Sequence, residues 1–229
     1  MRAAIFFTPP ASAALTRAAA QWLGRGVFDG EPTRDSDPAI DTLVAEPARY
    51  GFHATMKAPF RFADGAGLAD LDASLADFCA SRDPVAIDRL VIAALGPFFA
   101  FVPERSPPAL DELAEAVVRN FDAWRAPLTD AEYRRRRPDR LSERQRENLE
   151  QWGYPHVLRD FRFHMTLTGP VEPDERAGVE ARLRQRFADF DGAPLAVDRL
   201  GIFIEREPCA PFRLYSLHPF RPRAEDALT

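Results

Sequence analysis

The sequence predicts an α+β protein in which two related lobes, built from duplicated β-α-β units, surround a central cleft, with a helical insert between the repeats. A segment around His53 recurs around His164, and residues 84–90 recur at 194–200 at nearly the same offset. Such self-similarity indicates a repeated structural unit. We therefore expect one bilobal domain over residues 1–229, with a first repeat at about 1–106, an insert at about 107–153 and a second repeat at about 154–229.

The first repeat shows strand and helix patterns in alternation. The apolar residues 5–7 predict an opening strand, followed by a helix over 15–22. After a strand at 50–59, apolar residues recur every three or four positions over 68–78, which is the spacing of a helix packed on a sheet. Further strands are expected at 84–90 and 98–102.

The second repeat follows the same order. A strand at 161–169 precedes an acidic turn and a helical pattern over 179–187, and strands are expected at 194–200 and 212–217. Between the repeats, Pro107-Pro108 open a helix with an apolar stripe that extends to Trp124. The capping-box patterns at 129–132 and 142–145 predict two further short helices.

Composition narrows the classes of function. The chain has 46% hydrophobic and 28% charged residues, which is typical of globular proteins. A net charge of −5 disfavours a broad nucleic-acid-binding surface. Cys79 and Cys209 are the only cysteines, too few for a disulfide framework or a zinc cluster. The apolar run at 3–7 is too short for a signal peptide or a membrane span, so we expect a cytoplasmic protein with no membrane partner.

Two His-x-Thr motifs are the candidate chemical groups. His53 and Thr55 form one, and His164 and Thr166 form the other, each in a short apolar strand that ends at a proline. Because side chains alternate along a strand, the histidine and threonine of each motif point the same way. If the repeats pack about a pseudo-twofold axis, all four side chains meet in one cleft.

This set of side chains suits hydrolysis of a phosphodiester. Histidine titrates near neutral pH, so one imidazole can accept a proton from water while the other donates a proton to the leaving alkoxide. The threonine hydroxyls can bind the non-bridging phosphate oxygens, where charge concentrates in the transition state. The sequence offers no ligand cluster for a metal, and we expect neither a metal nor a cofactor.

Further residues are candidates for substrate binding. Strand parity predicts that Lys57, the only lysine, shares the cleft face with Thr55, and that Arg162 shares it with His164. Tyr154, like its neighbour Trp152, either stacks on a sugar or base or packs inside the protein. The four arginines at 134–137 are either a solvated helix end or a site for an anionic substrate.

The motifs resemble the two-histidine phosphoesterase superfamily. The segments Tyr50-Gly-Phe-His-Ala-Thr-Met-Lys-Ala-Pro-Phe60 and Phe161-Arg-Phe-His-Met-Thr-Leu-Thr-Gly169 are more closely similar to a branch whose genes often lie beside those for carbon–phosphorus bond cleavage in phosphonate use. The resemblance covers nearly the whole chain. It implies that the two histidines and two threonines are the catalytic set, and that the substrate is a small cyclic sugar phosphate such as a phosphoribosyl 1,2-cyclic phosphate.

Two alternatives stay open. One is an enzyme that opens the 2′,3′-cyclic phosphate at an RNA end, which arginines 134–137 near the cleft would support. The other is a protein of the same fold that binds a phosphate ligand without catalysis. The expected partner is a small phosphorylated substrate, with an RNA end as the second possibility, and the pattern does not define an oligomeric state.

Overall fold

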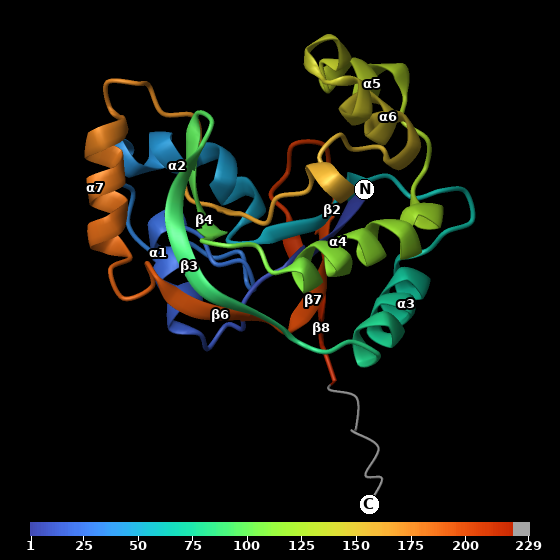
Figure 1. The fold of residues 1–229 in the computed structure, drawn as a ribbon, viewed down its shortest axis with the longest axis horizontal. Helices are drawn as coiled ribbons and strands as arrows, with labels where there is room; N and C mark the ends of the chain where they lie inside the picture. Colours follow the sequence, from blue (N-terminus) through green and yellow to red (C-terminus); the bar gives the residue numbers. More distant parts are fainter. Residues whose placement is uncertain (222–229) are drawn as a thin grey trace, which may run out of the picture.

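Eight strands of the computed structural model form one curled antiparallel sheet, and the structure describes residues 1–221 (Figure 1). Their order in the sheet is β6-β3-β4-β5-β2-β1-β7-β8. The strands are β1 (Arg2–Phe7), β2 (Ala54–Phe60), β3 (Val85–Leu95), β4 (Phe98–Pro103), β5 (Met165–Thr166), β6 (Ala193–Val197), β7 (Arg199–Glu205) and β8 (Arg213–Pro219). The mixed α+β fold is as predicted.

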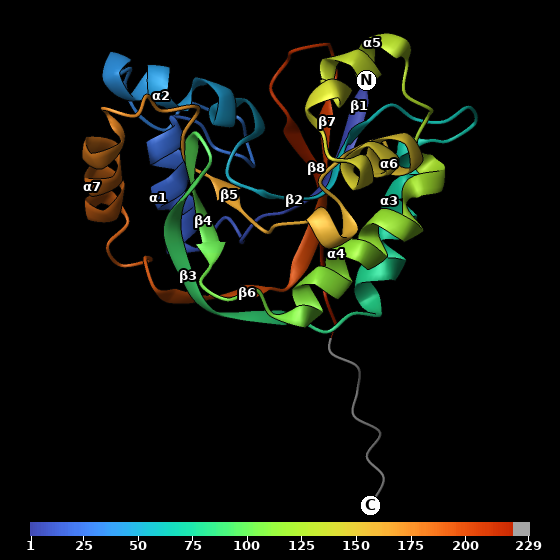
Figure 2. The same ribbon diagram turned by 45° about the horizontal axis from the view of Figure 1, so that its top comes forward.

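The helices lie in two groups, one on each half of the sheet. Figures 1 and 2 show α1, α2 and α7 together on one side, and α3 and α4 on the other, with α5 and α6 above α4. The helices are α1 (Ala14–Leu23), α2 (Pro38–Tyr50), α3 (Leu68–Ala80), α4 (Pro108–Asn120), α5 (Asp130–Arg135), α6 (Glu143–Trp152) and α7 (Arg176–Arg186). Short 3-10 helices cover Asp122–Trp124, Pro138–Arg140 and Leu158–Asp160.

Each half of the sheet combines strands from both sequence repeats. Strands β3 and β4 of the first repeat join β5 and β6 of the second, while β1 and β2 join β7 and β8 (Figure 2). The two halves meet where β2 pairs with β5, and the register there sets Ala54 opposite Met165. The structural halves therefore differ from the sequence repeats, because the repeats exchange strands.

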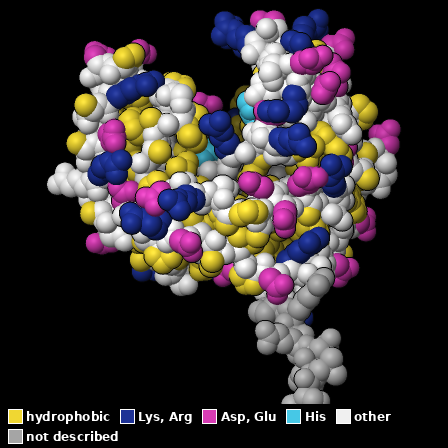
Figure 3. Space-filling model, in the orientation of Figure 1, with side chains coloured by type: hydrophobic (Ala, Val, Ile, Leu, Met, Phe, Trp, Pro, Cys, Tyr) yellow, Lys and Arg dark blue, Asp and Glu magenta, His cyan; other side chains and the backbone are white. Residues whose placement is uncertain are grey.

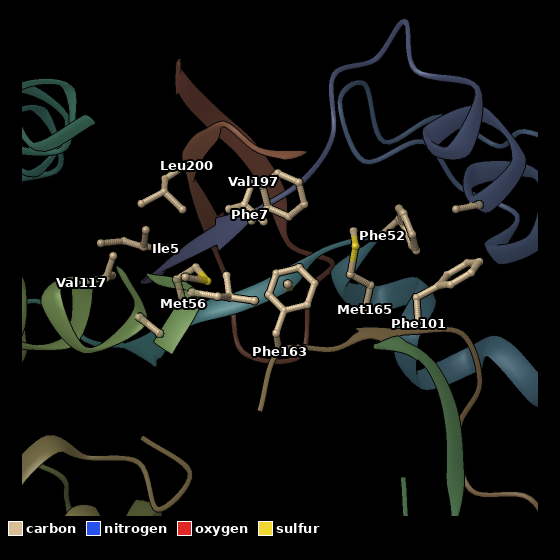
Figure 4. Packing of buried hydrophobic residues seen from close by; sticks show 14 of the residues in the cluster. Ile5, Phe7, Phe52, Met56, Phe101, Val117, Phe163, Met165, Val197 and Leu200 are labelled. Atoms are coloured by element: carbon tan, nitrogen blue, oxygen red, sulfur yellow. The ribbon is translucent and has the colours of Figure 1, made fainter. Parts of the chain in front are cut away.

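The core lies on the face of β2 and β5 that turns away from the cleft. Phe52, Met56, Phe163 and Met165 belong to one buried apolar cluster, as strand alternation predicted (Figure 4). Burying a side chain of this size contributes roughly 1.5–3 kcal/mol to folding, so packing of these side chains in the core holds both motifs in place. The packing fixes which face the intervening histidines and threonines occupy.

Local sequence explains most helix boundaries. Both predicted capping boxes form, with Thr129 accepting from the main-chain N–H of Glu132 at 3.2 Å and Ser142 accepting from that of Gln145 at 3.3 Å. Helix α2 was not expected, although the Asp37 carboxylate caps it and a proline follows as its first residue.

Two expected elements are divided in the structure. The helix predicted to extend to Trp124 ends at Asn120 and continues as a 3-10 turn. The strand expected over 194–200 is interrupted at Asp198, between β6 and β7. Among residues 1–221, no helix has the combination of length and apolar character needed to cross a membrane.

Candidate active site

A cavity of about 440 Å³ lies between the two halves of the sheet. The space-filling view shows a deep notch there, with histidine side chains visible along it (Figure 3). Both His-x-Thr motifs contribute to its wall. Its lining includes Arg2, Phe6, Arg49, Tyr50, His53, Thr55, Phe98, Glu132, Arg135, Arg136, Tyr154, His164 and Thr166.

The pairing of β2 with β5 brings the two motifs together. Ala54 and Met165, the middle residues of the motifs, are direct partners across this antiparallel pair. Continuing the register by one residue sets His53 beside Thr166 and His164 beside Thr55 on the opposite face from the core. The pseudo-twofold axis expected from the sequence thus passes between the middle residues of the two motifs.

Main-chain carbonyls fix the tautomer of both imidazoles. His53 Nδ1 lies 2.9 Å from the carbonyl oxygen of Gly51, and His164 Nδ1 lies 2.8 Å from that of Arg162. A carbonyl oxygen can only accept, so Nδ1 carries the proton and donates it. The Nε2 atom of each neutral ring is therefore left as a proton acceptor.

His53 lies between two aromatic rings. Its ring centroid is 4.0 Å from that of Phe6 and 5.7 Å from that of Tyr50, which stacks on it. Burial lowers the pKa of His53 to about 4, and the charge of His164 acts in the same direction against the hydrogen bond to Gly51. His53 is consequently neutral near pH 7, and Nε2 is its acceptor atom.

His164 has a more open environment. Its ring centroid lies 5.9 Å from that of Phe98 on β4. Burial lowers its pKa below the ordinary value, and the hydrogen bond to the Arg162 carbonyl opposes this shift. The two imidazoles therefore share a backbone contact and differ in how closely aromatic rings enclose them.

The threonines differ in their contacts. Thr55 Oγ1 lies 3.2 Å from His53 Nε2, so its hydroxyl can donate to that nitrogen when no ligand is bound. Thr166 lies on the same cavity wall. Thr168, which occupies the position equivalent to Lys57 in the repeat, is buried and its hydroxyl accepts from the main-chain N–H of Phe99 at 3.0 Å.

Lys57 does not lie on the cleft face that parity predicted. Adjacent residues Ile5 and Phe6 of β1 pair with Lys57 and Thr55, so Met56 is an extra residue in β2 and forms a bulge. The bulge inverts the alternation and turns Lys57 to the other face. There its side chain is 4% exposed, and Nζ donates to Asp122 Oδ1 at 3.1 Å and to the Val118 carbonyl at 3.4 Å.

The other predicted binding residues divide between the cavity and the surface. Tyr154 lines the cavity, and the guanidinium carbon of Arg136 lies 4.9 Å from its ring centroid. The side chain of Arg162 is exposed and does not line the cavity, because β5 begins only at Met165 and strand parity does not extend back to it. Its main chain contributes instead, through the carbonyl that orients His164.

Sequence reasoning missed several cavity residues. Arg2 and Arg49 lie near strand and helix ends far apart in the sequence, and nothing in their local pattern distinguishes them from other arginines. Tyr50 begins the first repeated segment, and the sequence pattern predicts no role for its side chain. Arg135 and Arg136, two members of the arginine run, line the cavity from α5 and the residue after it.

No group of three or more histidine, cysteine, aspartate or glutamate side chains that could hold a metal is present in residues 1–221. Cys79 is buried, and burial raises the pKa of its thiol to about 12. Cys209 is exposed, in a turn outside the cavity.

Paired His-x-Thr motifs at the centre of an interlaced α+β fold are the arrangement expected from the resemblance to two-histidine phosphoesterases. The chain belongs to the family described as "Protein of unknown function (DUF1045)", whose profile matches residues 55–213. That range includes the whole His164 motif and, of the His53 motif, Thr55 but not His53.

Two curated relatives carry the name ribose 1,5-bisphosphate phosphokinase PhnN. The protein from Janthinobacterium sp. (strain Marseille) is 36% identical over 236 residues, which cover 99% of this chain and 52% of the relative. The protein from Laribacter hongkongensis (strain HLHK9) is 35% identical, covering 95% of this chain and 51% of the relative. The chain thus spans about half the length of these relatives.

Among solved structures, E. coli LigT complexed with NADP+ is similar over 96% of both chains. The sequence identity is 13% and the TM-score is 0.37.

Proposed function

We propose that this chain hydrolyses a cyclic phosphodiester of a small sugar phosphate by acid–base catalysis between His53 and His164. The observation that carries the proposal is that main-chain carbonyls fix the same tautomer in both histidines. Each Nδ1 donates to a main-chain carbonyl, so each Nε2 is available for proton transfer beside the same cavity. A protein that only bound phosphate would have no use for two such groups.

In the proposed reaction, His53 is the base and His164 is the acid. His53 Nε2 takes a proton from water as the water oxygen bonds to phosphorus. The bond from phosphorus to a ring alkoxide oxygen breaks, and His164 Nε2 gives its proton to that oxygen. The product is a phosphate monoester with a new hydroxyl, and no oxidant or reductant takes part.

The surroundings of the rings support this assignment of roles. Burial lowers the pKa of His53 to about 4, so this imidazole stays neutral near pH 7, and aromatic rings enclose it on two sides. The hydroxyls of Thr55 and Thr166 would donate to the non-bridging oxygens, which gain charge as the transition state forms. Thr55 would exchange its contact with His53 for one with phosphate.

The name of the relatives supports a particular sugar phosphate. Opening a 5-phosphoribosyl 1,2-cyclic phosphate at the bond between phosphorus and O2 yields ribose 1,5-bisphosphate, the compound that the relatives' name says they phosphorylate. This chain has no Gly-x-x-x-x-Gly-Lys-Ser/Thr loop for a nucleoside triphosphate, and its one lysine is paired with Asp122. We therefore propose that it supplies the bisphosphate rather than consumes it.

Turnover of a panel of cyclic phosphates, followed by phosphorus NMR in EDTA, tests the proposal. The panel contains 5-phosphoribosyl 1,2-cyclic phosphate and nucleoside 2′,3′-cyclic phosphates. We expect ribose 1,5-bisphosphate as the product of the former. Tight binding of every member without turnover would replace the enzyme with a phosphate-binding protein.

An RNA 2′,3′-cyclic end is the second candidate, because Arg135 and Arg136 line the cavity. Several phosphate contacts along a strand would make kcat/KM fall steeply with salt, whereas a small substrate gives a shallow dependence. Preference for an oligonucleotide end, with a steep salt dependence, would select the RNA enzyme.

A further inference from the structure

One wall of the cavity holds two arginines on a shared carboxylate. Arg2 on β1 and Arg49 on α2 both line the cavity, and Glu205 at the end of β7 lies behind them. Arg2 Nε donates to Glu205 Oε2 at 2.5 Å, and Arg49 donates to Glu205 Oε1. Each carboxylate oxygen thus holds one guanidinium in place.

This group carries an uncompensated positive charge. The Glu205 side chain is 2% exposed, and although burial opposes its ionisation, Arg2 and Arg49 hold its pKa below the ordinary value. One ionised carboxylate balances only one of two permanently charged guanidinium groups. The surplus charge lies at the cavity wall, where both arginine side chains are about a quarter exposed.

Two further carboxylates line the cavity, Glu46 and Glu132, and they offset this charge only in part. The charge of Glu132 helps to raise the pKa of Arg2, but both of its oxygens accept hydrogen bonds from Arg61, at 3.0 and 3.1 Å. Arg135 and Arg136 add two further positive charges from the helical insert. A protein with a net charge of −5 therefore has a cavity in which arginines predominate.

The two arginines also have donors to spare and little freedom to move. In residues 1–221, Arg2 uses only Nε in hydrogen bonds, so both terminal nitrogens keep their N–H groups. Arg49 donates one hydrogen bond from each nitrogen, to the Ala210 carbonyl at 3.3 Å, the Tyr50 hydroxyl at 3.2 Å and Glu205, which leaves two of its N–H groups free for a ligand. The guanidinium carbons lie 5.9 and 5.8 Å from the ring centroid of Phe212, which supports both.

A single aromatic ring separates this group from the imidazoles. The Tyr50 centroid is 5.7 Å from that of His53 on one side and 5.1 Å from the guanidinium carbon of Arg49 on the other. Tyr50 also stacks on Phe212 with a centroid distance of 5.1 Å, so the neighbouring rings hold it in place between the two groups.

We propose that Arg2 and Arg49, held by Glu205, form a second anion subsite that binds a terminal phosphate monoester of the substrate. The inference rests on the proposed function and extends it: the cyclic phosphate lies between the histidines while the arginines select sugars that carry another phosphate. A guanidinium pair with free N–H groups matches the oxygens of a phosphate dianion.

The test compares two substrates, ribosyl 1,2-cyclic phosphate with and without the 5-phosphate, on wild type, Arg2→Met and Arg49→Met. We expect wild type to prefer the phosphorylated substrate, and each variant to lower the ratio of the two kcat/KM values about 10- to 100-fold, mainly through KM. Arg89→Met removes an exposed arginine that pairs with Glu104 outside the cavity and is the matched control. An unchanged ratio, or equal losses on both substrates, would overturn the subsite.

A binding measurement separates this inference from the proposed reaction. Ribose 5-phosphate is titrated calorimetrically into His53→Ala protein, with and without Arg2→Met. We expect at least 10-fold weaker binding when Arg2 is replaced, even if wild type turns over neither cyclic phosphate. Equal affinity in the two proteins, or no binding to either, would show that Arg2, Arg49 and Glu205 only tie α2 to the sheet.

Discussion

His53 and His164 make the same main-chain contact in different surroundings. Each donates from Nδ1 to the carbonyl two residues earlier, which follows from the duplicated backbone. His53 lies between Phe6 and Tyr50, whereas the contacting ring for His164 in the described part of the chain is Phe98. Duplication thus supplies two imidazoles of equal geometry, and aromatic neighbours that are not duplicated divide acid from base.

Removal of either imidazole should have the largest effect on catalysis. We expect His53→Ala and His164→Ala each to lower kcat about 10²- to 10⁴-fold, because each abolishes one proton transfer. The double variant should lose little more than the worse single one, since the pair acts as a unit. Steady-state kinetics on the preferred cyclic phosphate measures this.

His218→Gln is the control, because His218 Nε2 lies 2.7 Å from Asp72 Oδ1 and outside the cavity. Activity that survives loss of both cavity histidines would eliminate the proposed site.

Substitution of the threonines tests whether the two His-x-Thr motifs contribute equally to stabilising the charge on the non-bridging phosphate oxygens. We expect Thr55→Val and Thr166→Val each to lower kcat by about 10²-fold, because each removes one donor to a non-bridging oxygen without changing side-chain size. Thr55→Val should also free His53 Nε2 in the unliganded protein, since the 3.2 Å contact is lost. Losses below 3-fold in both variants would show that other groups bind these oxygens.

The pH dependence of kcat/KM sharpens the division of roles. A base must be deprotonated, so activity should rise through the pKa of His53, about 4. An acid must be protonated, so activity should fall through the pKa of His164, which burial holds below its ordinary value of 6.5. The profile in the free enzyme should therefore be a bell with its maximum on the acid side of neutrality.

Two matched variants assign the limbs of that bell. Tyr50→Ala opens the surroundings of His53 and should move only the acid limb to higher pH, by up to about one unit. Phe98→Ala opens the surroundings of His164, so it should raise the pKa of His164 and move only the alkaline limb to higher pH. If Tyr50→Ala moves the alkaline limb instead, His53 is the acid and the roles are reversed.

Lys57 marks where the two motifs cease to be equivalent, and its effect on catalysis should be the smallest. We expect Lys57→Met to leave kcat/KM within 2-fold of wild type and stability within about 1 kcal/mol, because Arg125 still pairs with Asp122. Asp122→Ala leaves the buried ammonium of Lys57 unpaired and should cost about 3–5 kcal/mol in urea unfolding. A large loss of activity in Lys57→Met alone would restore its predicted place in the cleft.

The sequence predicts the periodic parts of this molecule and misses what depends on a single irregularity. The His-x-Thr faces follow from strand alternation, since Phe52 and Met165 pack in the core and leave the histidines on the other side. The Met56 bulge leaves no trace in the residue pattern, and it turns Lys57 to the face of β2 opposite to the cleft face that was predicted.

Arginines 2 and 49 could not be predicted as a pair, because Glu205 joins them only through the tertiary fold.

The exchange of strands between repeats has a consequence for synthesis on the ribosome. Strand β1 pairs with β7 over the register from Arg2–Glu205 to Phe6–Gly201, across about 200 residues of chain. At translation rates of about 5–20 residues per second, β1 waits roughly 10–40 s for this partner. During that interval the wholly apolar run Ala3–Phe7 has an unpaired edge, so this half of the sheet should close last and be the part that most needs protection from aggregation.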